Sequence, residues 1–181
     1  MQIKLVTKVL GILLMIFSVS MLPPIIVSII FNDNEVWSFL YALFFILLAG
    51  SLMWFPTMQV NENMKLRDGF IVVVLFWIVL SLCGALPLIL SENVFMSYTD
   101  AFFESVSGLT TTGATIFSDL TNVPESILFY RQYLQWLGGL GIIVLAIAIL
   151  PTLGIGGMQL YKAEVAGPLK NKLTPRIAET A

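Results

Sequence analysis

The sequence predicts an all-α membrane protein with four transmembrane helices and one re-entrant pore helix that leads into a filter loop. Hydrophobic residues make up 58% of the 181 residues and charged residues only 11%, whereas an average soluble domain has about 25% charged residues. Four stretches without a charged side chain exceed the roughly 20 residues that a helix needs to cross a bilayer: residues 9–32, 36–61, 69–91 and 132–161. In hydrocarbon each stretch must pair its own backbone groups, so each is predicted to be a helix.

The composition also excludes several classes of function. The chain has no histidine, and Cys83 is its only cysteine. These counts rule out a disulfide framework, a CxxC redox pair, a His-containing catalytic triad and a metal site built from His or several Cys. A net charge of −2 gives no indication of nucleic-acid binding. An enzyme is the weaker hypothesis, because the four stretches contain no acidic or basic side chain and the sequence has no Walker A or GxSxG string.

The first stretch has features of a signal peptide, because Lys4 and Lys8 precede an apolar region. It lacks a small-x-small cleavage site, however, and its apolar part is too long for a signal peptide. Pro23 and Pro24 stand where cleavage would be expected. We therefore predict a retained helix that bends or ends near these prolines.

The distribution of basic residues indicates the orientation. With four spans only Arg131 lies on one side, and the other basic residues share the opposite side: Lys4, Lys8, Lys65, Arg67, Lys162, Lys170, Lys172 and Arg176. The positive-inside rule makes the latter side cytoplasmic and places both termini in the cytoplasm. The outer side collects acidic residues: Asp33, Glu35, Glu92, Asp100, Glu104, Asp119 and Glu125. An acidic outer face concentrates cations, although acidic residues also tolerate translocation better than basic ones.

The connection over residues 92–131 is apolar rather than hydrophilic, and residues 100–117 read DAFFESVSGLTTTGATIF. Such a segment is too short to span, and at membrane depth it is allowed only where protein buries it or where it lines a water-filled path. We predict a half-helix that starts between residues 97 and 100, where Ser, Thr and Asp provide capping groups, and that ends at Leu109 or Thr110. Its partly negative C-terminal end would point toward the membrane centre and favour a cation there.

Threonines and a glycine follow this half-helix, as TTTGAT over residues 110–115. Three β-branched residues disfavour further helix and favour an extended backbone, while glycine supplies conformational freedom. A ring of backbone carbonyls, with threonine hydroxyls beside them, can replace the hydration shell of a potassium ion. The alternative is a surface turn with no ligand. Between two spanning helices the filter hypothesis is favoured, with Thr110, Thr111, Thr112 and Gly113 as the potassium-binding residues.

Two strings carry a family resemblance: FFESVSGLTTTGAT and RQYLQWLGGLGIIVLAIAILP. They resemble the first repeat of TrkH-type bacterial uptake proteins, in the Trk/Ktr/HKT superfamily of potassium transporters, and the resemblance covers essentially the whole chain. It implies that Gly113 takes the place of the filter glycine, with Thr111 and Thr112 as carbonyl-contributing positions before it. It divides the chain into a peripheral helix pair (1–68), a first helix, pore-loop, helix repeat (69–165, filter 110–115) and a cytosolic tail that starts a linker (166–181).

The resemblance further implies a protein of the bacterial inner membrane, in which four non-identical repeats of one polypeptide surround a single pore. It implies a homodimer and a cytosolic nucleotide-binding partner of the TrkA type. Potassium would be the transported ligand, with no cofactor and with either a symport or a channel mechanism.

This sequence departs from the pattern of potassium channels in two ways. The filter lacks the second glycine and the tyrosine of TVGYG-type channels, which implies fewer ordered ion sites and weaker rejection of sodium. The sequence also contains a single pore loop, and a quarter of a ring cannot coordinate a dehydrated ion. We therefore expect an N-terminal piece of a longer transporter, which the tail over residues 175–181 supports. The alternatives are a homotetramer of this chain and a non-conducting structural subunit.

The last stretch would measure about 45 Å as one helix, which implies tilt, a break or protrusion. Gly138, Gly139 and Gly141 allow close approach of a neighbouring helix or of the pore loop. Pro151, with the glycines after it, allows a gating hinge, although ordinary membrane use of Gly and Pro explains it equally well. We expect Arg131 to pair with an acidic residue of the loop and to fix it against this helix; the candidates are Glu104, Asp119 and Glu125. Snorkelling to lipid head groups is the alternative.

Overall fold

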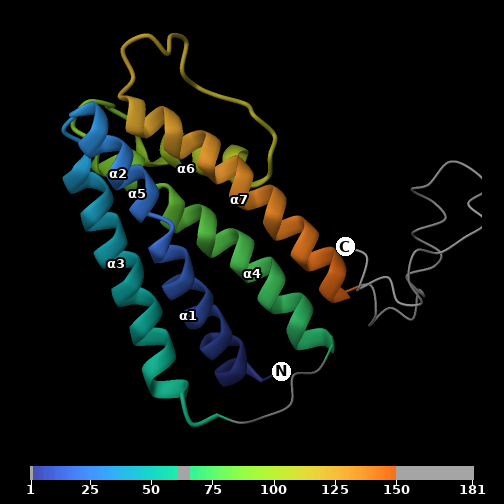
Figure 1. Cartoon of the computed structure of the whole chain (residues 1–181). Helices are drawn as coiled ribbons and strands as arrows, with labels where there is room; N and C mark the ends of the chain where they lie inside the picture. Colours follow the sequence, from blue (N-terminus) through green and yellow to red (C-terminus); the bar gives the residue numbers. More distant parts are fainter. Residues whose placement is uncertain (1, 61–65, 150–181) are drawn as a thin grey trace, which may run out of the picture. The chain divides into compact units, whose positions relative to one another are not determined.

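A computed structural model describes residues 2–60 and 66–149 (Figure 1). All regular elements in these residues are helices: α1 (Ile3–Val19), α2 (Leu22–Phe31), α3 (Val36–Trp54), the 3₁₀ turn η1 (Phe55–Thr57), α4 (Leu66–Gly84), α5 (Leu86–Leu90), α6 (Tyr98–Leu109) and α7 (Glu125–Ile149). The first compact unit extends from Met1 to Gly139, and the second, Leu140–Ala181, is described only as far as the end of α7.

Three helical segments among the described residues are long and apolar enough to cross a membrane: Ile3–Phe31, Val36–Thr57 and Arg67–Leu90. They correspond to the first three predicted spans. The fourth predicted span, 132–161, extends beyond the described residues. Its helix begins at Glu125 rather than at residue 132, because the predicted span was bounded by charged residues, and a helix can include them.

The predicted bend at the two prolines is confirmed. α1 ends at Val19 and α2 begins at Leu22, which places Pro23 and Pro24 in the first turn of the new helix. Proline fits there because the first turn leaves its backbone N–H groups without intrahelical acceptors. The third stretch breaks in the same way at Ala85, and Pro87 lies in the first turn of α5.

The first and third helices cross at two glycines. A Cβ atom built on Gly11 would lie 2.8 Å from the carbonyl oxygen of Gly50, and one built on Gly50 would lie 2.8 Å from the carbonyl oxygen of Gly11. Small residues at a crossing let two membrane helices approach to backbone contact. The N-terminal helix pair is therefore held together by main-chain packing at this point.

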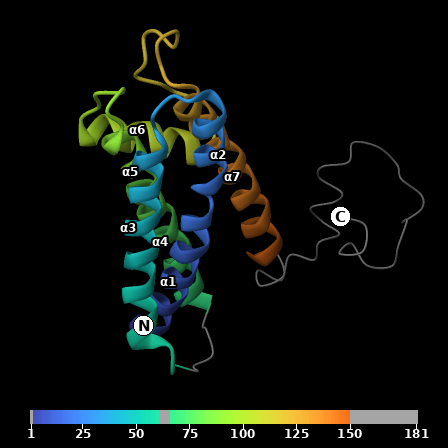
Figure 2. The ribbon, with the colours of Figure 1, turned by 60° about the vertical axis from the view of Figure 1, so that its left-hand side comes forward.

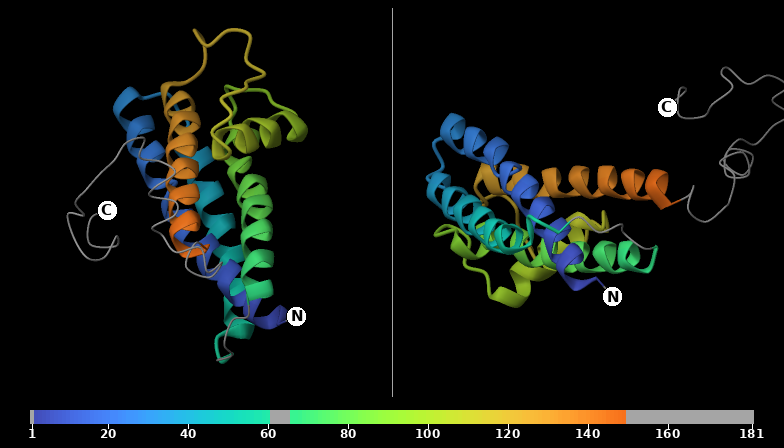
Figure 3. Two further views of the ribbon diagram at one scale, coloured as in Figure 1. Left: turned by 90° about the vertical axis from the view of Figure 1, so that its right-hand side faces the viewer. Right: turned by 90° about the horizontal axis from the view of Figure 1, so that it is seen from below.

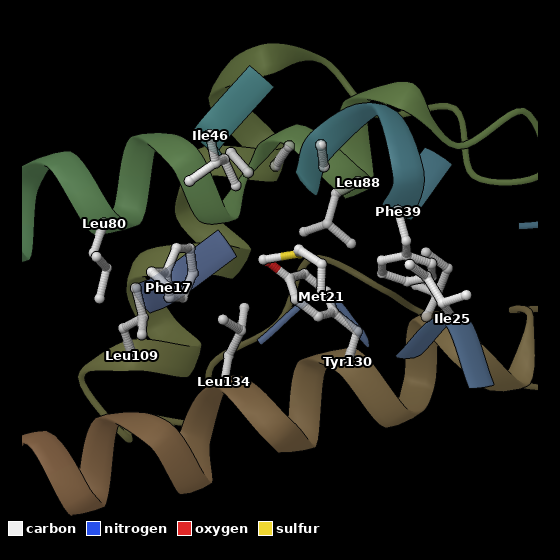
Figure 4. Close-up of a cluster of buried hydrophobic side chains, with 14 of the residues drawn as sticks. Phe17, Met21, Ile25, Phe39, Ile46, Leu80, Leu88, Leu109, Tyr130 and Leu134 are labelled. Atoms are coloured by element: carbon white, nitrogen blue, oxygen red, sulfur yellow. The ribbon is translucent and has the colours of Figure 1, made fainter. Parts of the chain in front are cut away.

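The largest core cluster joins this helix pair to the rest of the unit (Figure 4). It includes Phe39 of α3, Leu109 of α6 and Tyr130 of α7. The rings of Phe39 and Tyr130 meet edge to face with their centroids 5.4 Å apart. The hydroxyl of Tyr130 donates to the carbonyl of Gly84 at 2.8 Å, at the break between α4 and α5. The short helix α6 lies crosswise to the long helices (Figures 2 and 3) and packs on α4 and α5.

Candidate functional site

The half-helix predicted from the sequence is α6, and its bounds agree with the prediction. Ser97 caps its start, because the Ser97 hydroxyl accepts from the amide of Asp100 at 3.2 Å and donates to the Asp100 carboxylate at 2.7 Å. The helix ends at Leu109. Its 12 residues measure about 18 Å, which is too short to cross a bilayer core of about 30 Å.

The C-terminus of α6 is closed by a pair of backbone hydrogen bonds. The amide of Thr112 donates to the carbonyl of Ser107 at 2.9 Å, and the amide of Thr111 donates to the carbonyl of Gly108 at 2.9 Å. This pair defines a Schellman motif, whose left-handed position is usually occupied by glycine. Here Thr111 occupies it with φ of 56°, a conformation that strains a β-branched residue.

The motif changes one detail of the predicted loop. The sequence predicts an extended backbone directly after the half-helix, but Thr110 and Thr111 form its terminal turn, with Thr110 at φ −82° and ψ 3°. The reason is that the last carbonyls of a helix need donors, and the two amides of the turn supply them. The chain leaves the turn at Thr112, and Gly113 then has φ of 75°.

The strain at Thr111 can be measured through stability. Thr111→Gly should raise the unfolding temperature of the purified protein, because relief of about 1–3 kcal/mol of backbone strain exceeds the roughly 1 kcal/mol lost to a more flexible unfolded chain. Thr112→Gly is the matched control, since Thr112 does not have a positive φ. Thermal unfolding in detergent measures the stability of both variants. An equal loss of stability in the two would show that Thr111 carries no strain.

The predicted filter residues Thr110, Thr111, Thr112 and Gly113 are all exposed, as are Ala114 and Thr115. The hydroxyl of Thr110 donates to the carbonyl of Val106 at 2.8 Å and lies 2.8 Å from the hydroxyl of Thr112. Ser107 donates to the carbonyl of Ala114 at 2.6 Å and so ties the loop back onto α6. Ser107 was not among the residues predicted from the sequence; its only signal is its position three residues before the threonines.

Glu104 of α6 holds the loop in place through hydrogen bonds that both of its carboxylate oxygens accept. One carboxylate oxygen accepts from the hydroxyl of Thr115 at 2.6 Å and from the amide of Ile116 at 2.7 Å. The other accepts from Nε of Arg131 at 2.9 Å, and both side chains are buried. The guanidinium also lies over the ring of Phe117, 4.9 Å from its centroid. Among the three predicted partners of Arg131 the structure therefore selects Glu104.

Helix α7 supports the end of α6 through a glycine. A Cβ atom on Gly138 would overlap the carbonyl oxygen of Leu109, so the two backbones are in direct contact there. One residue earlier in α6, a Cβ on Gly108 would lie 3.0 Å from the Cβ of Leu134, which lies one turn before Gly138 on α7. Close approach at Gly138 is confirmed, whereas a Cβ on Gly139 would meet no atom of the described residues within 4 Å.

The loop presents neutral oxygens, from backbone carbonyls and threonine hydroxyls. Within residues 2–60 and 66–149 no group of three or more His, Cys, Asp and Glu side chains is arranged to hold a metal ion. Neutral oxygens held at fixed positions suit a monovalent cation that must be bound and then released. Carboxylate clusters instead bind divalent cations tightly.

An all-α membrane protein whose short helix and threonine–glycine loop are fastened between long helices belongs to the class of pore-loop cation transport proteins. The family model for TrkH, described as a cation transport protein, matches residues 37–181. The chain belongs to the TrkH family.

Relatives support this assignment over the whole chain. The "Trk system potassium uptake protein TrkH" of Vibrio parahaemolyticus is 54% identical over 182 residues, which cover 100% of this chain and 38% of the relative. The "Trk system potassium uptake protein TrkG" of Escherichia coli K12 is 42% identical over 181 residues, with 99% and 37% covered. The crystal structure of the potassium transporter TrkH from Vibrio parahaemolyticus matches with a TM-score of 0.82 at 48% identity and covers 99% of this chain and 35% of that chain. The chain thus spans little more than a third of the length of these relatives.

Proposed function

We propose that this chain supplies one of four pore repeats of a potassium uptake protein, and that Thr110, Thr111, Thr112 and Gly113 form its quarter of the filter. The observation that carries the proposal is that side chains of α6 and α7 hold the loop after α6 in place. Glu104, Ser107 and Arg131 hold an exposed run of neutral oxygens at the C-terminal end of a half-helix. The names of the relatives, which are potassium uptake proteins, support potassium as the transported ion.

The proposed mechanism involves no covalent chemistry. Potassium exchanges its hydration shell for carbonyl and hydroxyl oxygens. Several oxygens must surround the ion, because no single ion–oxygen contact offsets the free energy of dehydration. The negative end of the α6 dipole adds a favourable potential for a cation. The ion then moves down its electrochemical gradient, either alone as in a channel or together with a second ion as in a symporter.

We place the protein in the bacterial inner membrane with both termini in the cytoplasm. The bias of basic residues toward one side supports this orientation. On that side Lys8 donates to the carbonyls of Met58 at 3.0 Å and Val60 at 2.7 Å, so its ammonium group is held beyond the C-terminal end of α3. A homodimer and a cytosolic nucleotide-binding subunit of the TrkA type complete the proposed assembly.

Rubidium uptake tests the proposed function. In proteoliposomes, the complete transporter that contains this chain should take up ⁸⁶Rb⁺, and Gly113→Ser should reduce uptake to below about a tenth, because serine disfavours the left-handed backbone at that position. Gly139→Ala is the control, since a Cβ there meets no atom within 4 Å among residues 2–60 and 66–149. Uptake that is unchanged by Gly113→Ser would contradict the filter assignment.

The 181-residue chain alone separates the alternatives. A tetramer in detergent that takes up ⁸⁶Rb⁺ would show that four copies of this chain build a pore. A monomer or dimer without uptake, together with uptake by the complete transporter, would support the role of one repeat among four. Absence of uptake by the 181-residue chain and by the complete transporter would favour the hypothesis of a non-conducting structural subunit.

A further inference from the structure

The short connection between α2 and α3 makes hydrogen bonds to the segments before and after the pore loop. It consists of Asn32, Asp33, Asn34 and Glu35, and both asparagines have positive φ, of 55° and 64°. Asparagine tolerates this conformation better than most residues, so the sequence permits a tight turn. The turn points its two carboxylates at segments that lie far away in the sequence, and we call Asp33 and Glu35 the outer clasp.

Glu35 holds the segment that leads into the pore loop. Its side chain has no exposed surface. One oxygen accepts from the hydroxyl of Ser91 at 2.6 Å and from the amide group of Asn93 at 2.9 Å. Asn93 also donates to the carbonyl of Asp33 at 3.3 Å. The residues between α5 and α6 are therefore bound to the turn through a buried carboxylate.

Asp33 holds the segment that leads out of the pore loop. Its carboxylate accepts from the backbone amide of Ser126 at 2.8 Å, in the first turn of α7 and 93 positions further along the chain. The end of α2 and the start of α7 lie at the same end of the unit (Figures 2 and 3). A carboxylate at a helix N-terminus satisfies a free amide and interacts favourably with the helix dipole.

The same carboxylate is fixed by its own turn. Asp33 also accepts from the hydroxyl of Ser28 and from the amide of Glu35. Burial raises the pKa of Asp33, but hydrogen bonds from Ser126, Ser28 and Glu35 outweigh it, so the pKa lies below its ordinary value of 3.8. Asp33 is therefore charged at neutral pH and suited to cap α7.

We infer that Asp33 and Glu35 are positioning residues for the filter, because one rigid turn of the peripheral helix pair fixes the entry and the exit of residues 91–126. Everything between these two anchors, including α6 and the filter, is held at its ends by this turn. Two features indicate that Glu35 does more than hold the turn in place. Burial of a carboxylate is costly, and the second oxygen of Glu35 has no hydrogen-bond partner among the described residues. An apolar residue at position 35 would anchor the turn at lower cost but would leave Ser91 and Asn93 unoriented.

The inference rests on the proposed function, and its main test uses the complete transporter. Asp33→Asn and Glu35→Gln keep the size of each side chain but replace an acceptor oxygen with a donor amide, which opposes the donors that surround it. We expect the KM for ⁸⁶Rb⁺ to rise, or the preference for Rb⁺ over Na⁺ to fall, by roughly three- to tenfold. The amount of transporter in the membrane should stay close to that of the unmodified protein.

Glu92→Gln is the matched control. Glu92 is exposed on the same side and makes no hydrogen bond or ion pair within the described residues, so this variant removes an outer charge without touching the clasp. Equal effects in the control would assign the change to surface charge and overturn the inference. Loss of protein in proportion to loss of uptake, with KM and ion preference unchanged, would show a merely structural role and would also overturn it.

Hydrogen exchange separates this inference from the proposed function, because it requires no transport. In Asp33→Asn, amide exchange should accelerate over residues 91–126 and leave α1 and α3 unchanged. If the transporter takes up no ⁸⁶Rb⁺ but this local acceleration is seen, the clasp still positions the loop and the proposed function is wrong. Unchanged exchange over residues 91–126 would overturn the inference, whatever the uptake.

Discussion

Gly138→Ala should reduce ⁸⁶Rb⁺ uptake by the complete transporter to below about a tenth and lower its unfolding temperature. The added Cβ would overlap the carbonyl oxygen of Leu109 and would lie 2.7 Å from its carbonyl carbon. Both atoms are backbone, so no rotamer change relieves the clash, and the last turn of α6 must move away from α7. Overpacking typically costs about 1–3 kcal/mol, and a clash between backbones belongs at the upper end of this range. Because Leu109 directly precedes Thr110, the displacement reaches the proposed filter.

Gly139→Ala provides the comparison, since it makes the same chemical change one position further along α7, where the added Cβ meets no atom within 4 Å in the part of the chain that the structure describes. Alanine also favours a helix over glycine by about 1 kcal/mol, so this variant should unfold at the same or a higher temperature. Thermal unfolding in detergent and uptake in proteoliposomes measure both variants side by side. Equal behaviour of the two would mean that α7 does not support the end of α6.

Arg131→Gln should destabilise the protein by about 3–5 kcal/mol, because it leaves the buried carboxylate of Glu104 without its partner. Glu104 also binds Thr115 and Ile116, so the effect should extend to the loop and lower both the amount of assembled transporter and its uptake. Quantitative membrane immunoblots and ⁸⁶Rb⁺ uptake give the two readouts.

The double variant Arg131→Gln with Glu104→Gln tests whether the pair acts as a unit. It removes both charges, so we expect it to recover part of the stability lost in Arg131→Gln alone, with a coupling of about 0.5–3 kcal/mol between contacting residues. Strictly additive effects would show that the two residues contribute independently. Unchanged amount and uptake in Arg131→Gln would remove the proposed role of the ion pair.

Local signals in the sequence predict most of the fold. The runs without charge place the first three spans, Pro23 and Pro24 place the bend, and Ser97 places the start of α6. The start of α7 was predicted too late, because an uncharged run marks the extent of a span and not of a helix, and α7 begins before this run and includes Glu125 and Arg131. The pairing of Arg131 with Glu104 depends on tertiary structure, and no local pattern reports that.

The candidate site was predicted less completely than the fold. β-branched threonines indicate an extended backbone, but the capping demand of α6 forces Thr111 into a left-handed turn. The sequence offered three acidic partners for Arg131, and only packing distinguishes them. The contact between Asp33 and Ser126 joins residues 93 positions apart, which lies beyond any pattern of local periodicity or spacing.

The contacts described above also set an order of assembly during synthesis. The crossing at Gly11 and Gly50 uses only the first part of the chain, so it can form while later segments are still in the ribosome or the insertion machinery. The exit of the loop, by contrast, cannot be fixed until residues 126 and 131 have emerged, because Asp33 binds the amide of Ser126 and Glu104 pairs with Arg131, both on α7. The N-terminal helix pair therefore acts as a folding template that forms before the proposed filter is complete. A ribosome-bound chain whose emerged part ends before residue 126 should hold a protease-resistant helix pair and a pore loop that is more sensitive to protease.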